Sequence, residues 1–133
     1  MYPQMSIDLA LYRLEMAQEA LEDAQDAIGR ERFRNAANRS YYAIFNAMRA
    51  LLNLEGKDFK RHSGVIAEFR RSFIKSGILP VKFSDMIGDA FDIRNASDYE
   101  NFYVVSKQEV VQQTENAAVF VDAVKRCLME RIS

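Results

Sequence analysis

The chain has 133 residues, of which 49% are hydrophobic, and a formal net charge of −1. This length predicts one domain over residues 1–133 with a sizeable core, and the near-neutral charge gives no general argument for nucleic acid or a membrane as a partner. One cysteine excludes an internal disulfide and is typical of a reducing compartment. No apolar run reaches the roughly 18 residues that span a bilayer, and no secretion signal opens the chain. We therefore expect a soluble cytoplasmic protein.

The balanced net charge hides an uneven distribution of charge along the chain. Residues 1–28 carry six acidic residues against Arg13 alone, and residues 57–82 carry seven basic residues against two acidic ones. Two interpretations remain open, namely complementary solvated helix faces or a surface that binds anions. The basic segment supplies four candidate RNA- or anion-binding residues: Lys60, Arg61, Arg70 and Arg71.

Apolar residues recur at helical spacing in five segments, the first two of which are long. The first expected helix covers about residues 6–28 and ends at Gly29, and the second covers about residues 30–54 and ends before Gly56. Small alanines alternate with leucines along the first segment, which allows another helix to approach it closely. The two segments are expected to pack as antiparallel neighbours.

Three further helices are expected in the second half of the chain. One begins near Ser63, a candidate N-cap, and ends before Gly77, and the next covers residues 83–94. The last opens with Ser106 and Glu109 in the pattern of a capping box. The fold class predicted is all-α, a four- or five-helix up-and-down bundle with two long antiparallel helices.

Arg94 lies on the apolar row of the fourth segment, where a guanidinium is costly unless it is paired or used. The residues after it include Asn95, Asp98 and Tyr99, which can form hydrogen bonds or transfer protons. One interpretation is an i,i+4 ion pair between Arg94 and Asp98 that only stabilises the helix. The other is a role for Arg94 in a ligand site or at a dimer interface.

The residue types exclude several kinds of chemistry. His62 and Cys127 are the only soft metal ligands, and no pair of Glu-x-x-His motifs is present for a di-iron site. The sequence contains neither a glycine-rich phosphate loop nor a Gly-x-Ser-x-Gly elbow. We therefore expect neither metal nor cofactor, and any catalysis would use Arg, His, Tyr, Asp or Asn side chains.

Three segments together resemble one known family. Residues 35–52, which include Tyr41 and Tyr42 followed by Ala-Ile-Phe, resemble the long second helix of HEPN domains. Residues 60–65, Lys-Arg-His-Ser-Gly-Val, resemble the start of the third HEPN helix, and residues 94–99, Arg-Asn-Ala-Ser-Asp-Tyr, fall where the family carries its signature. The likeness is greatest to small stand-alone HEPN proteins, and it implies a HEPN-like bundle.

The resemblance also implies a homodimer whose two signature segments meet, often encoded beside a minimal nucleotidyltransferase that neutralises it. Many HEPN proteins are metal-independent ribonucleases and several are toxins, with the signature Arg on the scissile phosphate and a His as acid or base. Arg94 and Asn95 match the first two signature positions, but Tyr99 stands where that His would be. An unperturbed tyrosine is a poor base at about pH 7, so His62 is the alternative source of an imidazole.

Three functions remain open at this point. The first is a module that binds a nucleotide, RNA or a nucleotidyltransferase partner, as one half of a toxin–antitoxin-like pair in which the partner modifies the Tyr99 hydroxyl. The second is a metal-independent endoribonuclease that cleaves single-stranded RNA. The third is a structural dimerisation domain in which Arg94 forms only inter-subunit pairs.

Overall fold

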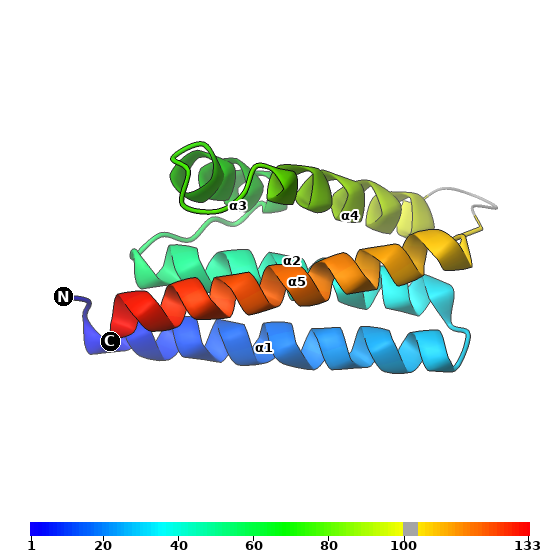
Figure 1. The fold of residues 1–133 in the computed structure, drawn as a ribbon, viewed down its shortest axis with the longest axis horizontal. Helices are drawn as coiled ribbons and strands as arrows, with labels where there is room; N and C mark the ends of the chain where they lie inside the picture. The colour runs from blue at the N-terminus through cyan, green and yellow to red at the C-terminus, as the bar shows by residue number, and fades with distance from the viewer. Residues whose placement is uncertain (100–103) are drawn as a thin grey trace.

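The computed structural model describes residues 1–99 and 104–133, and in these ranges the chain is all-α. The elements in order are α1 (Gln4–Gly29), α2 (Phe33–Leu54), α3 (His62–Phe69), the π-helical turn η1 (Arg70–Ile74), α4 (Lys82–Tyr99) and α5 (Lys107–Ile132). Figure 1 shows α1, α2 and α5 packed together, with α3 and α4 in a second layer above them. The predicted helical bundle is confirmed. Within the described ranges, no helix is both long and apolar enough to cross a bilayer.

The two long helices α1 and α2 run antiparallel, as expected from the sequence (Figure 1). Three alanines spaced seven residues apart, Ala10, Ala17 and Ala24, are fully buried along α1. Alanine side chains on the contact row allow two helix axes to come close together. The short connection reverses the chain at Glu31, whose φ of 60° lies in the left-handed region. The alanine row therefore explains the close pairing that positions α2.

Helix α2 lies at the centre of the molecule. Fifteen of its 22 residues are buried, and Tyr41, Ile44 and Met48 are completely inaccessible. It contacts α1, α3, α4 and α5, so each of its faces is covered over part of its length. Side chains that α2 presents to α3 and α4 are therefore held rigidly by packing.

The start of α5 agrees with the prediction from the sequence, and the start of α3 differs from it. Ser106 is the N-cap of α5, and its Oγ accepts a hydrogen bond from the backbone N–H of Glu109 at 3.3 Å. The expectation that Ser63 caps the third helix is wrong, because α3 already begins at His62. Arg61 is the extended residue before the helix, and its carbonyl accepts the first backbone bonds of the turn.

The η1 turn widens the third helical segment by one residue. The backbone N–H of Lys75 donates to the carbonyl of Arg70 at 2.8 Å, a bond over five residues instead of four. Phe69 and Phe73 stack at 5.2 Å between ring centroids and are both buried beneath this turn. Gly77, with a φ of 86°, then ends the segment in a backbone conformation that glycine adopts without strain.

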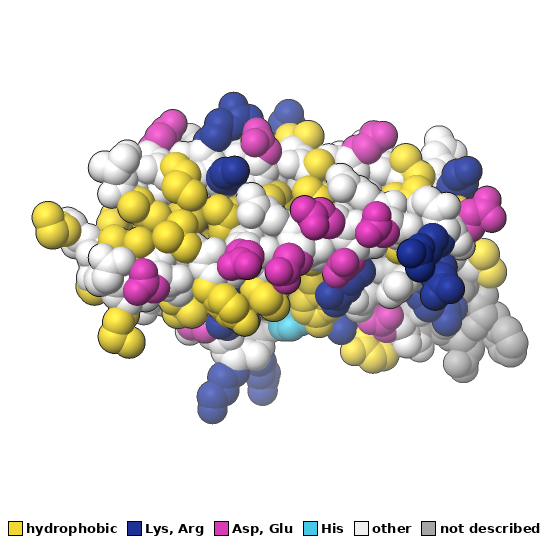
Figure 2. Space-filling view, turned by 90° about the horizontal axis from the view of Figure 1, so that it is seen from below, with side chains coloured by type: hydrophobic (Ala, Val, Ile, Leu, Met, Phe, Trp, Pro, Cys, Tyr) yellow, Lys and Arg dark blue, Asp and Glu magenta, His cyan; other side chains and the backbone are white. Residues whose placement is uncertain are grey.

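The acidic N-terminal segment forms an exposed face. All six of its carboxylate side chains are exposed on α1. Figure 2 shows acidic side chains in a band across the face seen from below, with apolar side chains beside it. The acidic half of the charge asymmetry is thus a solvated helix face in this structure.

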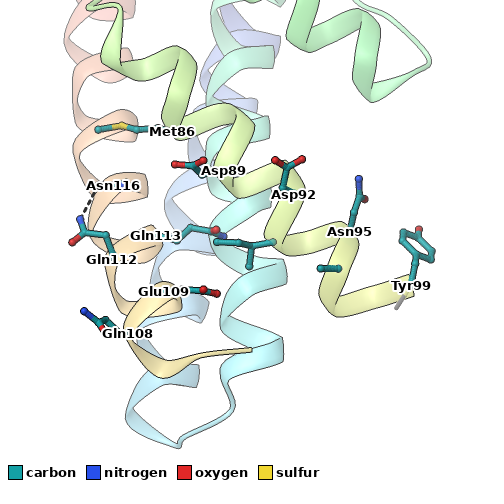
Figure 3. Close-up of a pocket in the computed structure, with 12 residues that line it drawn as sticks. Met86, Asp89, Asp92, Asn95, Tyr99, Gln108, Glu109, Gln112, Gln113 and Asn116 are labelled. Atoms are coloured by element: carbon teal, nitrogen blue, oxygen red, sulfur yellow. Dashed lines mark hydrogen bonds between the residues drawn. The ribbon is translucent and has the colours of Figure 1, made fainter. Parts of the chain in front are cut away.

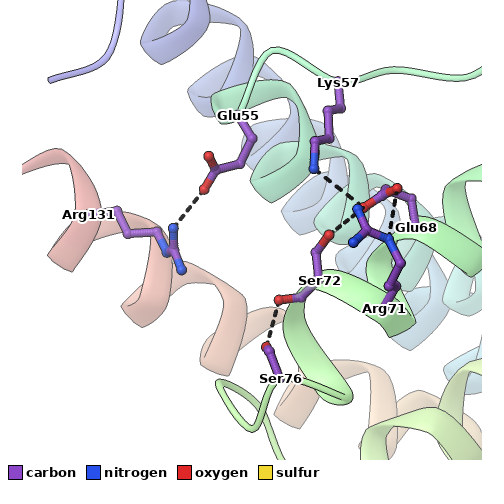
Figure 4. A network of polar contacts seen from close by, with 7 residues as sticks. All are labelled: Glu55, Lys57, Glu68, Arg71, Ser72, Ser76 and Arg131. Atoms are coloured by element: carbon purple, nitrogen blue, oxygen red, sulfur yellow. Dashed lines mark hydrogen bonds and ion pairs between the residues drawn. The ribbon is translucent and has the colours of Figure 1, made fainter.

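Glu68 on α3 is the centre of a polar network within the basic segment, residues 57–82 (Figure 4). Its carboxylate accepts hydrogen bonds from the Ser72 hydroxyl, the Arg71 guanidinium and, at 3.4 Å, the Lys57 ammonium. The Ser72 and Arg71 hydrogen bonds lower the pKa of Glu68 from 4.5 to about 2. The charged form of Glu68 is therefore favoured by folding.

The variant Glu68→Gln tests this linkage through the pH dependence of thermal unfolding. Because the folded-state pKa is depressed, the stabilisation by Glu68 is complete above pH 4.5 and is lost as the pH falls towards 2. We expect the variant to melt at a lower temperature than the parent near neutral pH, with the difference vanishing near pH 2. Asp122→Asn, which removes an exposed carboxylate from the ion pair with Arg126 on α5, is the control for loss of a surface charge. A pH-independent difference in melting temperature would contradict the linkage.

Candidate functional site

Arg94 is held on the face of α4 that packs against α2. Its side chain is only 15% exposed, and its Nε lies 3.0 Å from Oδ2 of Asp98, one helical turn further on. The Nε–H is not directed along this line and has no hydrogen-bond partner within the described residues, so the contact is an ion pair. The i,i+4 pair expected from the spacing is therefore present, but it satisfies Arg94 only in part.

Three tyrosine rings surround the guanidinium of Arg94. Its central carbon lies 5.6 Å from the ring centroid of Tyr41, 5.7 Å from that of Tyr42 and 5.5 Å from that of Tyr99. Cation–π attraction of this kind offsets part of the cost of burying the charge. The Tyr42 hydroxyl and the Asn95 side-chain oxygen accept hydrogen bonds from the guanidinium, each at a long 3.4 Å. The end of the guanidinium is thus available to a stronger acceptor.

Tyr41 connects His62 of α3 to the tyrosines that surround Arg94. The Tyr41 hydroxyl is 2.8 Å from Nδ1 of His62, and its side chain is completely buried. Burial raises the pKa of Tyr41 well above its usual value of 10, so the hydroxyl remains protonated. When it donates to Nδ1 of a neutral imidazole, the ring proton is on Nε2. His62 is thereby oriented and can present an N–H donor.

The surroundings of His62 favour the neutral ring. Burial lowers the pKa of His62 below 6.5, and the positive charges of Arg94 and Arg49 lower it further. The ring also packs against Phe45, with centroids 4.1 Å apart. His62 is therefore mainly neutral at about pH 7, the form that can accept a proton and, once protonated, donate it again.

We define the Arg94 site by six side chains from three helices: Tyr41, Tyr42, His62, Arg94, Asp98 and Tyr99. Four of the five candidate catalytic residues belong to it, with His62 joined through Tyr41. The fifth, Asn95, contacts the guanidinium from outside the group. Of the two α2 tyrosines, Tyr41 is completely buried and Tyr42 lies at the edge of the core. Adjacent residues on a helix point in different directions, so two consecutive tyrosines cannot both lie on one core-facing row. This feature of the sequence could have indicated that one of them belongs to a site.

No sequence pattern singled out Arg39, a second cation next to the site. Its guanidinium lies 5.3 Å from the ring centroid of Tyr42, on the same helix. Its Nε and Nη2 donate to the side-chain oxygen of Asn38 at 3.1 and 2.9 Å. Arg39 thus adds positive charge beside Tyr42.

The four candidate anion-binding residues fall into two groups. Lys60 and Arg61 are exposed and directly precede His62. Arg70 is half-buried and donates to the carbonyl of Ser84 at 2.9 Å, which ties η1 to α4. Arg71 is paired with Glu68. Lys60 and Arg61 are therefore better placed for a ligand at the Arg94 site.

The chemistry that these side chains offer is that of a guanidinium, an imidazole and phenols. Within residues 1–99 and 104–133, no group of three or more His, Cys, Asp or Glu side chains is arranged to hold a metal ion. Cys127 is half-buried and packs against the core from α5. The arrangement is suited to contacts with an anion and to proton transfer.

The family model described as the HEPN domain matches residues 10–127, a range that includes every residue of the Arg94 site. The chain belongs to the HEPN family. The HEPN resemblance of the tyrosine pair and the Arg94 segment is thus confirmed at the level of the family.

Two curated relatives of this HEPN domain extend over most of its length. A UPF0332 protein of Thermotoga maritima is 33% identical over 117 residues, which cover 88% of this chain and 89% of the relative. A protein of Methanocaldococcus jannaschii with a provisional toxin name is 29% identical over 118 residues, which cover 89% of this chain and 80% of the relative. The crystal structure of TT1696 from Thermus thermophilus is similar with a TM-score of 0.74, at 17% identity, over 88% of this chain and 96% of that one. That structural similarity shows the shared fold.

The single histidine allows the electrostatics of the HEPN site to be measured directly. We expect an NMR titration to give a pKa below 6.5 for His62, and Arg94→Gln to raise it because a nearby positive charge is removed. Arg126→Gln removes an exposed arginine of α5 and is the matched control. Equal pKa values in the parent and in Arg94→Gln would show that Arg94 does not act on the imidazole.

Proposed function

We propose that this HEPN domain is a binding module whose Arg94 site takes a phosphate group of RNA or of a nucleotide. The observation that carries the proposal is the incomplete satisfaction of a largely buried guanidinium. Both neutral hydrogen bonds to Arg94 are 3.4 Å long. Phosphate oxygens form charge-assisted bonds to arginine at about 2.7–2.9 Å, so phosphate would be a better partner.

The surroundings of Arg94 supply further features of a nucleic-acid site. Tyr99 is 71% exposed while its ring lies beside the guanidinium, so it can stack on a base. Exposed Lys60 and Arg61 stand at the start of the helix that carries His62. Their charges would attract a polyanion and make its binding dependent on salt. These features favour RNA or a nucleotide as the ligand.

We further propose that the domain acts as a homodimer and as the HEPN half of a pair with a minimal nucleotidyltransferase. The provisional toxin name of an archaeal relative supports a toxin-like role for the pair. The exposed Tyr99 is the group that such a partner would contact and modify. Co-purification with the partner and the mass of the Tyr99 peptide test this part of the proposal.

Arg94→Ala tests phosphate binding by fluorescence anisotropy with a labelled single-stranded RNA. We expect the affinity to fall about tenfold or more, because a hydrogen bond to a charged group contributes about 1.5–3 kcal/mol. Arg94→Lys retains the charge but lacks the planar fork, and should lie between the parent and the alanine variant.

Arg126→Ala, on an exposed part of α5, is the matched control for the loss of one arginine. Circular dichroism and sedimentation should accompany each measurement, since Arg94 is also packed among tyrosines. Unchanged RNA affinity in a folded Arg94→Ala protein would refute the proposal. Weaker dimerisation with unchanged RNA affinity would instead support a structural dimerisation domain.

The hydrogen bond between Tyr41 and His62 favours a second candidate function, metal-independent cleavage of RNA. In this reaction the ribose 2′-hydroxyl attacks the adjacent phosphorus and loses its proton to water, while the bond to the 5′-oxygen breaks. The protonated form of His62, whose Nδ1–H would donate to the Tyr41 hydroxyl, would give its Nε2 proton to the leaving 5′-oxygen and return to the neutral ring, and Arg94 would hold the phosphate. The products would be a 2′,3′-cyclic phosphate and a 5′-hydroxyl.

His62→Ala separates this candidate from simple binding. We expect the parent to cleave single-stranded RNA in EDTA and the variant to be slower by about a hundredfold or more, the usual contribution of a general acid. RNA affinity should change much less than the rate. If no RNA in a broad panel is cleaved while binding persists, the domain is a binding module without this activity.

A further inference from the structure

A cleft of about 960 Å³ lies between α4 and α5. Figure 3 shows its labelled side chains extending from both helices. Its polar walls include Asp89 and Asp92 from α4 and Glu109 and Gln113 from α5, and its apolar surface includes Met86 and Ile93. The cleft adjoins the Arg94 site, since Tyr99 and Asn95 also line it, but it differs in charge, because the described residues that line it include three carboxylates but neither lysine nor arginine.

The two carboxylates on the α4 wall have no ion-pair partner among the described residues, although Asp92 also lines a smaller pocket together with Arg70. Asp89 and Asp92 are exposed, and neither forms an ion pair or a hydrogen bond within residues 1–99 and 104–133. Residues three apart on a helix are neighbours, with Cβ atoms about 5–6 Å apart. Two adjacent carboxylates of this kind attract a positively charged group.

A buried acceptor on the α5 wall points to the same kind of ligand. Gln113 is only 4% exposed, and its Nε2 donates to the carbonyl of Ala37 at 3.2 Å and to Oγ of Ser40 at 2.6 Å. These two bonds hold the Nε2 end of the amide, and its Oε1 has no partner among the described residues. Figure 3 shows Gln113 and Glu109, one turn apart on α5, extending to the same side of that helix. An unpaired buried oxygen is costly, and a ligand with N–H donors would satisfy it after a small side-chain movement.

We propose that this cleft binds an alkyl polyamine. Ammonium groups carry N–H donors and no acceptor, which matches walls made of carboxylate and amide oxygens. The methylene segments between ammonium groups would lie on Met86, Ile93 and Ala96. The proposal can be tested separately from phosphate binding, because it uses neither Arg94 nor His62, although Tyr99 borders both sites.

The arrangement of the carboxylates favours an extended cation over a compact one. A bound Ca²⁺ or Mg²⁺ needs several oxygens converging within about 2.0–2.6 Å of one point. Figure 3 shows the carboxylates of Asp89, Asp92 and Glu109 apart from one another along the cleft. A flexible chain with separated charges can reach such groups one at a time.

Isothermal titration calorimetry with spermidine tests the proposal. The parent should bind one spermidine in a saturable manner, and the pair Asp89→Asn with Asp92→Asn should weaken binding about tenfold or more, the effect of losing charge-assisted hydrogen bonds. The control is Asp23→Asn with Asp26→Asn, an exposed pair with the same spacing on α1. Equal weakening by both double variants would show general attraction to an acidic protein and overturn the proposal.

Two additional measurements identify the occupant and the place. Gln112→Lys, on the exposed rim of the cleft, introduces a competing ammonium without disturbing a buried side chain and should also abolish spermidine binding. The side-chain amide resonances of Gln113 should shift on titration with spermidine. Unshifted resonances, a lack of saturable binding, or tighter binding of Mg²⁺ or of an arginine-rich peptide would each refute a polyamine site.

Discussion

The complete burial of Tyr41 imposes a requirement that several other features of the molecule meet. A phenol hydroxyl removed from water must find a hydrogen-bond partner, and the imidazole of His62 supplies it. The start of α3 must therefore lie against α2. The same tyrosine ring lies beside the guanidinium of Arg94, so this charged side chain of α4 can be buried against α2. One side chain thus couples three helices and sets the positions of the two groups best able to act on a phosphate.

Helix α4 separates two opposite electrostatic environments across its own width. One side presents Arg94 to the tyrosines of α2, and the other side presents Asp89 and Asp92 to the cleft with α5. A helix is only about 10–12 Å across, so two ligands of opposite charge could occupy the protein at the same time. The two ligands would then attract each other across the width of α4.

Local patterns in the sequence were sufficient for the helices and for contacts within one helix. Apolar residues at helical spacing located α1, the capping-box pattern located the start of α5, and the i,i+4 spacing of Arg94 and Asp98 predicted their ion pair. The contact of Tyr41 with His62 could not be read in this way, because it joins residues 21 positions apart across a turn whose path depends on packing. The unpaired oxygen of Gln113 was equally hidden, since it depends on how α5 meets α2.

The wide η1 turn is in effect one inserted residue in an otherwise regular helix. Each residue of an α-helix turns the chain by about 100°, so the extra residue rotates everything that follows it relative to α3. Arg70, the first residue of the turn, donates to the Ser84 carbonyl, so the turn is also tied directly to α4. Removal of a single residue between Arg70 and Ile74 would restore an ordinary helix and shift the register of the following chain. The geometry of α4, and with it the placement of Arg94, therefore depends on the length of a segment that contributes no side chain to the Arg94 site.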